Sequence, residues 1–331
     1  MDMTTSKAKG VGLLSGGLDS ILAVKILQAQ NVDVICVTFA TYFFDEAPGM
    51  KAGNTWGIPV CALDIGQKHF EMLKKPLYGY GRWMNPCIDC HALMLREAGR
   101  FMEEEGADFL FTGEVLGQRP MSQRRDALRI VEDLAGYPGR ILRPLSARLL
   151  PPTVPELDGL IDRDRLLDIH GRSRKRQMAL AEAFGITAYP QPTGGCVLTN
   201  EGFGKKLRTL LEYFPCAASR EVELLRLGRH FLLPEGSLCT VGRNQQDNER
   251  LEGLVESRDI LISVADYPGP VGLLLPAPGF EKDLELAAMA VIAYSDAPLS
   301  GLVTVRCRHM GKTSLSSLVN PGKDHFRGCQ I

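Results

Sequence analysis

Two groups of residues have types and spacing suited to chemistry, and the first is the turn "SGGLDS" at residues 15–20. It follows the apolar run "VGLL" and leads into the helical "ILAVKILQAQ". The two glycines let the backbone approach a ligand closely, and the helix that starts near Asp19 presents free N–H groups to the same point. The turn predicts a phosphate or pyrophosphate site without the lysine of a P-loop. The residues expected to line it are Ser15, Gly16, Gly17, Asp19 and Ser20.

The second group is a set of three cysteines: Cys87 and Cys90 in "CIDCH", and Cys196 after a pair of glycines. A helix that opens on cysteines places them where its dipole lowers thiol pKa, and the thiolate is the reactive and metal-binding form. "CIDCH" also matches the c-type haem attachment signature, which requires export to an oxidising compartment. Zinc held by the three thiolates plus His91 is a further alternative.

The whole-chain composition limits the class of protein. A chain of 331 residues exceeds what one core usually serves, so we expect two domains. No apolar run has transmembrane length, and "MDMTTSKAKG" lacks a signal-peptide core, so we expect a cytoplasmic protein with no membrane partner. Nine scattered cysteines, an odd number, are no disulfide framework. With a net charge of −1, any nucleic-acid partner must meet a local basic patch.

The order of the elements predicts how these groups are positioned. Apolar strands alternate with helical stretches in the first half, which indicates an α/β fold with a doubly wound parallel sheet. Ligands of such sheets lie at the carboxyl ends of the strands, where both "SGGLDS" and "TGEVLGQ" fall. Gly113, Glu114 and Gln118 are therefore expected near the ligand. From about residue 218 the pattern changes, and we expect domains at 1–216 and 217–331, the second a smaller α+β domain.

A strand followed by S-G-G-x-D-S and a helix resembles the PP-loop of the ATP pyrophosphatase superfamily, whose fold is adenine nucleotide alpha hydrolase-like. Those enzymes cleave ATP between the α- and β-phosphates, adenylate a carbonyl oxygen and release pyrophosphate. The resemblance implies ATP and Mg²⁺ as cofactors, with Gly113 and Gln118 beside the nucleotide. It also implies that Asp19 is catalytic, acting on the phosphates through Mg²⁺ or by ordering the loop. No lysine is needed, because the group held is the leaving pyrophosphate.

Three further stretches narrow the resemblance to tRNA thiouridine synthetases. "MNPCIDCHALMLREA" (84–98) looks like the N-P-C-x-x-C-N motif of bacterial tRNA 2-thiouridylases, with His91 in place of Asn. "PTGGCVLTNEGFG" (192–204) is similar to their segment around a second cysteine. "TGEVLGQRPMSQ" with "ILRPLS" resembles tRNA 4-thiouridine synthetases, whose rhodanese and THUMP modules are not recognisable here. The implied function is an ATP-dependent tRNA uridine sulfurtransferase that makes 4-thiouridine or 2-thiouridine.

The resemblance implies two mechanisms in which Cys90 and Cys196 are catalytic. In one, Cys90 carries a persulfide and Cys196 resolves it as a disulfide. In the other, Cys87, Cys90 and Cys196 ligate a [4Fe–4S] cluster whose open iron binds hydrosulfide. The sulfur donor would be inorganic sulfide or a persulfide derived from a cysteine desulfurase.

Contacts with tRNA are expected from two basic segments and from the last domain. The tail "VGRNQQDNERLEGLVESRDILISVADYPGPVGLLL" resembles the RNA-associated NFACT-R domain. The alternative is that this domain serves for capping or dimerisation, in which case the protein would be a homodimer. The rival functions are sulfuration or amidation of a small molecule and non-catalytic RNA binding. The expected tRNA-binding residues are Arg119, Arg124, Arg125, Arg172, Arg174, Lys175 and Arg176.

Overall fold

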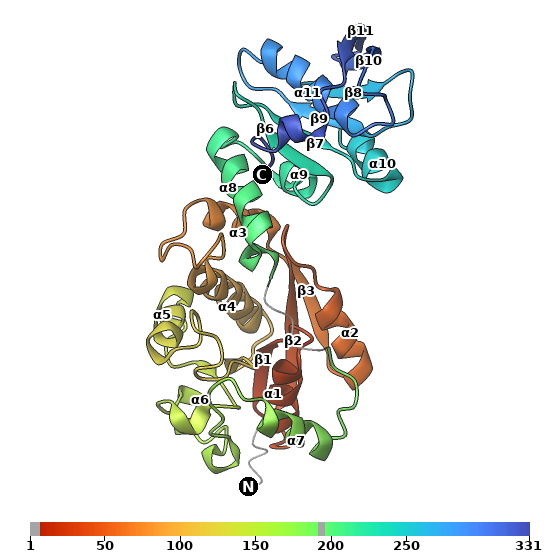
Figure 1. Ribbon diagram of the computed structural model, residues 1–331. Coiled ribbons are helices and arrows are strands. Elements are labelled where there is room, and N and C mark those ends of the chain that lie inside the picture. Colours follow the sequence, from red (N-terminus) through yellow and green to blue (C-terminus); the bar gives the residue numbers. More distant parts are fainter. Residues whose placement is uncertain (1–6, 191–195) are drawn as a thin grey trace. The chain divides into compact units, whose positions relative to one another are not determined.

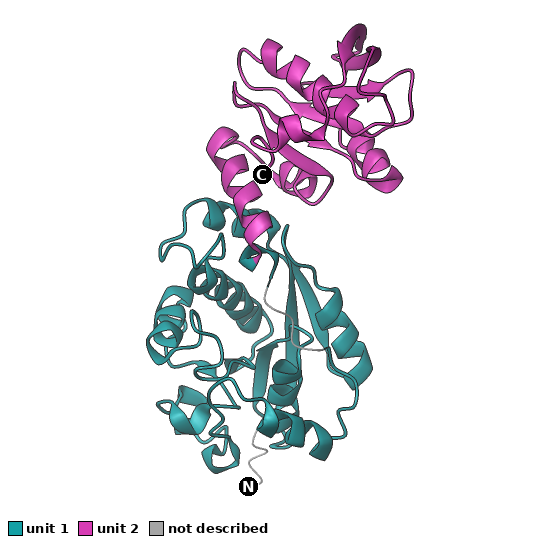
Figure 2. Ribbon diagram, viewed as in Figure 1, with its two compact units in different colours: residues 1–199 teal, residues 200–331 magenta. Residues whose placement is uncertain are grey.

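The computed structural model describes residues 7–190 and 196–331, and the chain divides into two compact units, residues 1–199 and 200–331 (Figure 2). The glycines and the threonine that precede Cys196 in the second cysteine motif lie outside the described residues. The domain boundary predicted after residue 216 falls inside the second unit, beyond the helix α8 (Glu201–Tyr213).

Unit 1 is built on a parallel sheet with the strand order β3-β2-β1-β4-β5 (Figure 1), which confirms the predicted α/β class. The central strands are buried on both faces, so they read as continuous apolar runs rather than as alternating ones. The strands are β1 Lys9–Leu13, β2 Asp33–Ala40, β3 Val60–Asp64, β4 Phe109–Phe111 and β5 Ile141–Leu142.

Helices cover both faces of this sheet. One apolar cluster joins α1, α2 and α7 to one face, and a second joins α3, α4 and α5 to the other. The helices are α1 Leu18–Gln28, α2 Ala47–Trp56, α3 Gly66–Lys74, α4 Cys87–Glu104, α5 Arg125–Ala135, α6 Val154–Leu157 and α7 Lys175–Ala183. Short 3₁₀ turns lie at Ala147–Leu149, Arg163–Arg165 and Val197–Thr199.

Glycines in β1 explain how its neighbour β4 packs so closely. A Cβ atom on Gly10 would lie 2.9 Å from the ring of Phe109, and one on Gly12 would lie 2.2 Å from the ring of Phe111. The rings therefore fill the space that side chains of β1 would otherwise occupy. This packing brings the carboxyl ends of β1 and β4, which carry the two predicted motifs, next to each other.

Unit 2 is an α+β domain, as predicted. Its antiparallel sheet has the order β11-β10-β8-β9-β7-β6, and α11 packs on it through an apolar cluster that includes Val291 and Phe231. The strands are β6 Arg229–Leu232, β7 Leu238–Val241, β8 Ile260–Val264, β9 Val271–Leu275, β10 Leu302–His309 and β11 Lys312–Val319. The other helices are α9 Ser219–Leu224, α10 Gln245–Gly253, α11 Glu281–Ala293 and a 3₁₀ turn at Lys323–Phe326.

Among the described residues, none of the helices combines the length and the apolar character needed to cross a membrane.

Candidate active site

The turn between β1 and α1 presents an uncapped helix start. Gly17 is the N-cap residue, and no side chain caps the helix. Gly16 has a φ of +79°, and a Cβ atom there would lie 2.4 Å from the carbonyl oxygen of Pro48, so only glycine fits. Ser20 Oγ donates to the carbonyl of Gly17 at 2.8 Å and lies 3.4 Å from Ser15 Oγ. Backbone N–H groups and the Ser15 hydroxyl therefore lie at a place suited to an anion, while the Ser20 hydroxyl is already used by the Gly17 carbonyl.

The turn that follows β4 packs directly against the start of α1. A Cβ atom on Gly113 would lie 2.5 Å from the backbone carbon of Asp19 and from the amide nitrogen of Ser20. Gln118 Nε2 donates to Asp19 Oδ2 at 2.8 Å, and Gln118 Oε1 lies 3.5 Å from Gln177 Nε2 on α7. Asp19 Oδ1 is buried and has no hydrogen-bond partner in the described part of the chain. A ligand or cation at this point would satisfy that oxygen.

The cysteine-bearing start of α4 is tied to two other segments. The buried Asp89 carboxylate accepts hydrogen bonds from the amides of Leu77 and Tyr78 at 2.7 and 3.0 Å, which anchors the loop before α4. The amide of Met84 donates to the carbonyl of Leu198 at 3.3 Å. This last contact brings the segment that holds Cys196 beside the segment that holds Cys87, although they are distant in sequence.

The three predicted cysteines lie near enough for the charge of one to affect the ionisation of another. Burial raises the pKa of the Cys90 thiol well above its ordinary value, and negative charge on Cys196 and Cys87 raises it further. Burial also raises the pKa of Cys196, although the backbone amide of Leu198 opposes this. The expectation that the helix start lowers these pKa values is therefore wrong for Cys90, because burial outweighs the effect of the helix. All three are free thiols in this structure.

As they lie, these thiols do not form a metal site. No group of three His, Cys, Asp or Glu side chains in residues 7–190 and 196–331 converges on a point where a metal ion would sit. Cys87 Sγ instead accepts a hydrogen bond from Asn85 Nδ2 at 3.3 Å, and Cys90 Sγ lies 3.2 Å from His69 Nε2. His91, considered as a zinc ligand, has its Nδ1 2.9 Å from Glu114 Oε1. The side chains as placed do not fit a cluster or a zinc ion.

A buried ion-pair chain runs from α4 across the sheet edge to α5. His91 contacts Glu114, Arg143 Nε lies 3.0 Å from Glu114 Oε2, and Arg143 Nη1 pairs with Glu132. Burial opposes ionisation of Glu114, but the Arg143 guanidinium and the hydrogen bond with His91 outweigh it and lower the pKa to about 2. Arg143 itself is 3% exposed. Glu114 is therefore an ionised structural group rather than a general acid.

Residues 113 and 114 connect the anion-binding turn to the cysteines. Gly113 touches the backbone of Asp19 and Ser20, while the adjacent Glu114 binds His91, which directly follows Cys90. Both predicted motifs therefore meet at the carboxyl edge of the sheet, as expected for ligand sites in parallel α/β folds.

The predicted tRNA-binding residues lie in two segments of unit 1 that are mostly exposed. Arg124 pairs with Asp126 at 3.2 Å, and Arg176 pairs with Asp168 at 2.6 Å. The second segment runs close to the first, because the amide of Gly171 donates to the carbonyl of Leu116 at 2.7 Å. Arg174 is half-buried. The exposed members of both segments are Arg119, Arg124, Arg125, Arg172, Lys175 and Arg176.

Sequence reasoning missed His69 and the partners of Glu114. His69 is fully buried on α3, against the rings of Phe43 and Phe44. A lone histidine on an apolar helix face carries no signal that separates it from a core residue. Arg143 lies in the motif "ILRPLS", which suggested a family but no partner.

Comparisons with known proteins found a family match in the second unit and relatives of the first unit. Residues 228–325 match the family described as the NFACT protein RNA binding domain. A probable tRNA sulfurtransferase of Thermococcus kodakarensis is 31% identical over 149 residues, which cover 42% of this chain and 37% of that protein. The tRNA-specific 2-thiouridylase MnmA of Agrobacterium fabrum is 26% identical over 199 residues, covering 52% of this chain and 46% of that protein.

A solved 4-thiouridine synthetase–RNA complex with bound ATP is 27% identical, with a TM-score of 0.33, and the match covers 41% of this chain and 36% of that one. The chain spans less than half the length of these three proteins. The comparisons confirm the resemblance drawn from the motifs: the first unit is similar to tRNA sulfurtransferases and tRNA 2-thiouridylases of the PP-loop type, and the second to the NFACT RNA-binding domain.

Proposed function

We propose that the chain is an ATP-dependent tRNA uridine sulfurtransferase. The observation that carries the proposal is the connection through residues 113 and 114, which sets an uncapped glycine turn beside three interacting thiols. Relatives of the first unit are named tRNA sulfurtransferase and tRNA-specific 2-thiouridylase. A turn for ATP phosphates and a group of thiols are the two parts that replacement of a uracil oxygen by sulfur requires.

In this proposal the turn binds ATP, and α1 stabilises its phosphates. The N–H groups at the start of α1 and the hydroxyl of Ser15 bind the outgoing pyrophosphate, and the Ser20 hydroxyl would join them by turning away from the Gly17 carbonyl. The residues present fit a Mg²⁺ ion, because Asp19 Oδ1 is a carboxylate oxygen that is buried without a hydrogen-bond partner in the described residues. Such an ion would neutralise phosphate charge. Gln118 holds the other oxygen of Asp19 and so orients the carboxylate.

The sulfur step is assigned to Cys90 and Cys196. A uracil carbonyl oxygen attacks the α-phosphate, pyrophosphate leaves, and the oxygen becomes part of an AMP leaving group. The terminal sulfur of a Cys90 persulfide attacks the ring carbon and displaces AMP. Cys196 then attacks Cys90 Sγ, which releases the thiolated base and forms a Cys90–Cys196 disulfide. An external thiol reductant restores both thiols. The outer sulfur of this persulfide would be transferred from the persulfide of a cysteine desulfurase, which is already at the required oxidation level, whereas inorganic sulfide would be the donor only in the cluster mechanism below.

A [4Fe–4S] cluster on Cys87, Cys90 and Cys196 is the alternative sulfur carrier. It requires these thiols to converge further than they do here. Iron and acid-labile sulfide measured after anaerobic purification decide between the two mechanisms. About four iron atoms per chain, lost in Cys87→Ser, would support the cluster. Iron-free protein that still thiolates tRNA would support the persulfide.

We further propose that tRNA contacts both the basic segments of unit 1 and the second domain, taken as 217–331. The match to an RNA-binding family supports a role of this domain in holding the tRNA. The exposed basic side chains near residues 119–125 and 172–176 would supply phosphate contacts beside the catalytic edge.

The proposal is tested by separating its two half-reactions on an unmodified tRNA transcript. Asp19→Asn is expected to abolish both pyrophosphate release and thionucleoside formation. Cys90→Ser and Cys196→Ser are expected to retain tRNA-dependent pyrophosphate release but to lose thionucleoside, measured by mass spectrometry of the digested tRNA. The same spectra distinguish 4-thiouridine from 2-thiouridine. Pyrophosphate release that does not depend on tRNA would contradict the proposal and favour a small-molecule substrate.

A further inference from the structure

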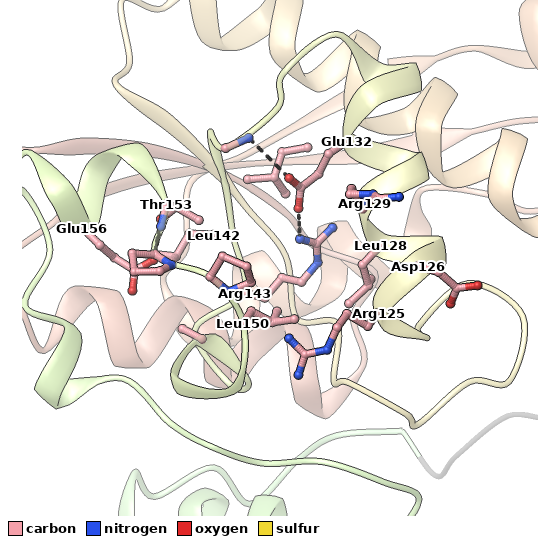
Figure 3. Close-up of a pocket in the computed structure, with 15 residues that line it drawn as sticks. Arg125, Asp126, Leu128, Arg129, Glu132, Leu142, Arg143, Leu150, Thr153 and Glu156 are labelled. Carbon is pink, nitrogen blue, oxygen red and sulfur yellow. Dashed lines mark hydrogen bonds and ion pairs between the residues drawn. The ribbon is translucent and has the colours of Figure 1, made fainter.

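Unit 1 has a cavity of about 550 Å³ that neither the glycine turn nor the cysteines line. Helix α5, the end of β5 and the segment 147–156 form its walls (Figure 3). The walls are largely apolar and include Leu128, Leu142 and Leu150. A volume in this range is typical of sites that hold a molecule of nucleotide size.

Each acidic residue of this cavity has a basic partner, although Glu132 shares its partner with Glu114. Arg143, held between Glu114 and Glu132, closes the inner wall, and Figure 3 shows its contact with Glu132. The pairs of Asp126 and Glu156 carry no net charge, whereas Glu114 and Glu132 share Arg143 and so leave one excess negative charge at the inner wall. The three wall pairs are Asp126 with Arg124, Glu132 with Arg143 and Glu156 with Arg163.

Two arginines on the same wall have no such neutralisation. Arg125 and Arg129 lie four residues apart on α5, so they share one face of the helix. Arg125 donates to the carbonyl of Leu149 at 2.8 Å, and neither arginine has an acidic partner in the described part of the chain. Both side chains are exposed. The cavity thus combines an apolar interior with two exposed arginines that have no acidic partner, and these outnumber the one excess carboxylate of the group Glu114–Arg143–Glu132.

We infer that this cavity binds one nucleotide of a single-stranded RNA segment. The base would lie against the leucine wall, and the adjoining phosphates would bind Arg125 and Arg129. A strand is favoured over a free nucleotide, because Arg125 and Arg129 lie one helical turn apart and can contact successive phosphates, and because the exposed Arg119, which precedes the cavity along the chain, also has no acidic partner in the described residues. The inference rests on the proposed function only in taking RNA as the substrate class. It assigns a site distinct from that of the reacting uridine.

The inference is tested by fluorescence anisotropy of the full chain with a labelled eight-nucleotide RNA that lacks uridine. The double variant Arg125→Gln, Arg129→Gln is expected to raise Kd about tenfold and to reduce the slope of log K against log salt by about 1.4. Leu150→Trp fills the cavity without changing charge, because Leu150 is a half-buried wall residue. It is expected to raise Kd at least fivefold and to leave the salt slope unchanged.

A matched control removes two positive charges elsewhere on unit 1. Lys51→Gln with Lys75→Gln changes two exposed lysines, on α2 and just after α3, that have no acidic partner in the described residues, and is expected to alter Kd less than twofold. Thermal unfolding followed by tryptophan fluorescence checks that each variant is folded. If Leu150→Trp lowers the melting temperature, Leu150→Phe replaces it, because the phenylalanine side chain fills the cavity with a smaller ring. Wild-type affinity in a folded blocking variant overturns the inference, as does an equal loss in the control.

Two further measurements distinguish failure of this inference from failure of the proposed function. In the first, a mixture of AMP, CMP and GMP is added at concentrations near the Kd of the RNA. Displacement of the RNA would show that the cavity binds free nucleotides, and would overturn the inference that it binds an RNA strand. Asp19→Asn is expected to lose pyrophosphate release but to bind this RNA as wild type does. Loss of RNA binding in that variant would place the RNA at the glycine turn instead.

Discussion

His69 Nε2 lies 3.2 Å from Cys90 Sγ, and this contact defines the resting state of the thiol. Burial lowers the pKa of His69 to about 4, and burial together with the neighbouring thiols raises the pKa of Cys90. At neutral pH the pair is therefore an uncharged imidazole beside a protonated thiol. His69 Nδ1 is buried and has no partner in the described residues, so nothing there stabilises an imidazolium.

The first prediction concerns the order in which the cysteines of the metal-free protein react with iodoacetamide at pH 7.5. Cys61 and Cys216 are exposed and are expected to react first, whereas Cys90 is expected to react at least tenfold more slowly. The reason is that only the thiolate reacts, and each unit by which a pKa is raised lowers its population about tenfold. Peptide mass spectrometry at timed intervals gives the three rates. Equal rates would show that Cys90 is ionised at rest.

The second prediction concerns acid stability through Glu114. Its pKa is lowered in the folded chain from an ordinary 4.5 to about 2, so the folded state binds this proton more weakly than the unfolded state. The resulting stabilisation, on the order of 3 kcal/mol, is fully present above pH about 4.5 and is lost as the pH falls towards 2.

Glu114→Gln removes this dependence. The difference in unfolding free energy between wild type and Glu114→Gln is expected to shrink as the pH falls through that window. Urea unfolding followed by the fluorescence of Trp56 and Trp83 measures it, because both tryptophans lie in unit 1. Asp126→Asn, in an exposed pair with Arg124, is the control and is expected to change stability by less than about 0.5 kcal/mol. If the difference in unfolding free energy stays constant between about pH 4.5 and pH 2, Glu114 is not the group that causes this pH dependence.

Local sequence signals were sufficient to predict the parallel sheet and the glycine turn, and the reason is physical. A strand buried on both faces must be apolar throughout, and a turn with a φ of +79° beside the Pro48 carbonyl must be glycine. Both constraints act on neighbouring residues, so they appear in short stretches of sequence.

Contacts between distant segments could not be predicted in this way. His69 reaches Cys90 from another helix, and Arg143, which directly follows β5, reaches Glu114 in the turn after β4. The direction of the Cys90 pKa shift was predicted wrongly for the same reason. The helix start is visible in the sequence, but the burial that outweighs it, and the charge of the distant Cys196 that adds to it, exist only in the folded chain.

The third prediction tests the close approach of β4 to α1. Gly113→Ala is expected to abolish tRNA-dependent pyrophosphate release and to lower stability by about 1–3 kcal/mol. The added Cβ atom would lie 2.5 Å from the backbone of Asp19 and Ser20, so α1 must shift away from the turn. Gly253→Ala adds the same atom where no other atom lies within 4 Å, and is expected to leave both quantities unchanged. Normal pyrophosphate release in a folded Gly113→Ala would show that the turn tolerates this shift.

The fourth prediction distinguishes free from paired basic residues in the segment 172–176. Arg172 and Lys175 are exposed and have no acidic partner in the described residues, whereas Arg176 is paired with Asp168 at 2.6 Å. An arginine that must leave a carboxylate to bind a phosphate gains less from binding, and it releases fewer counterions. For tRNA bound to the full chain, Arg172→Gln with Lys175→Gln is therefore expected to reduce the slope of log K against log salt by about 1.8. Arg176→Gln is expected to reduce it by less than about 0.9. A larger effect from Arg176→Gln alone than from the double variant would mean that tRNA displaces Asp168, and would make Arg176 the principal phosphate contact.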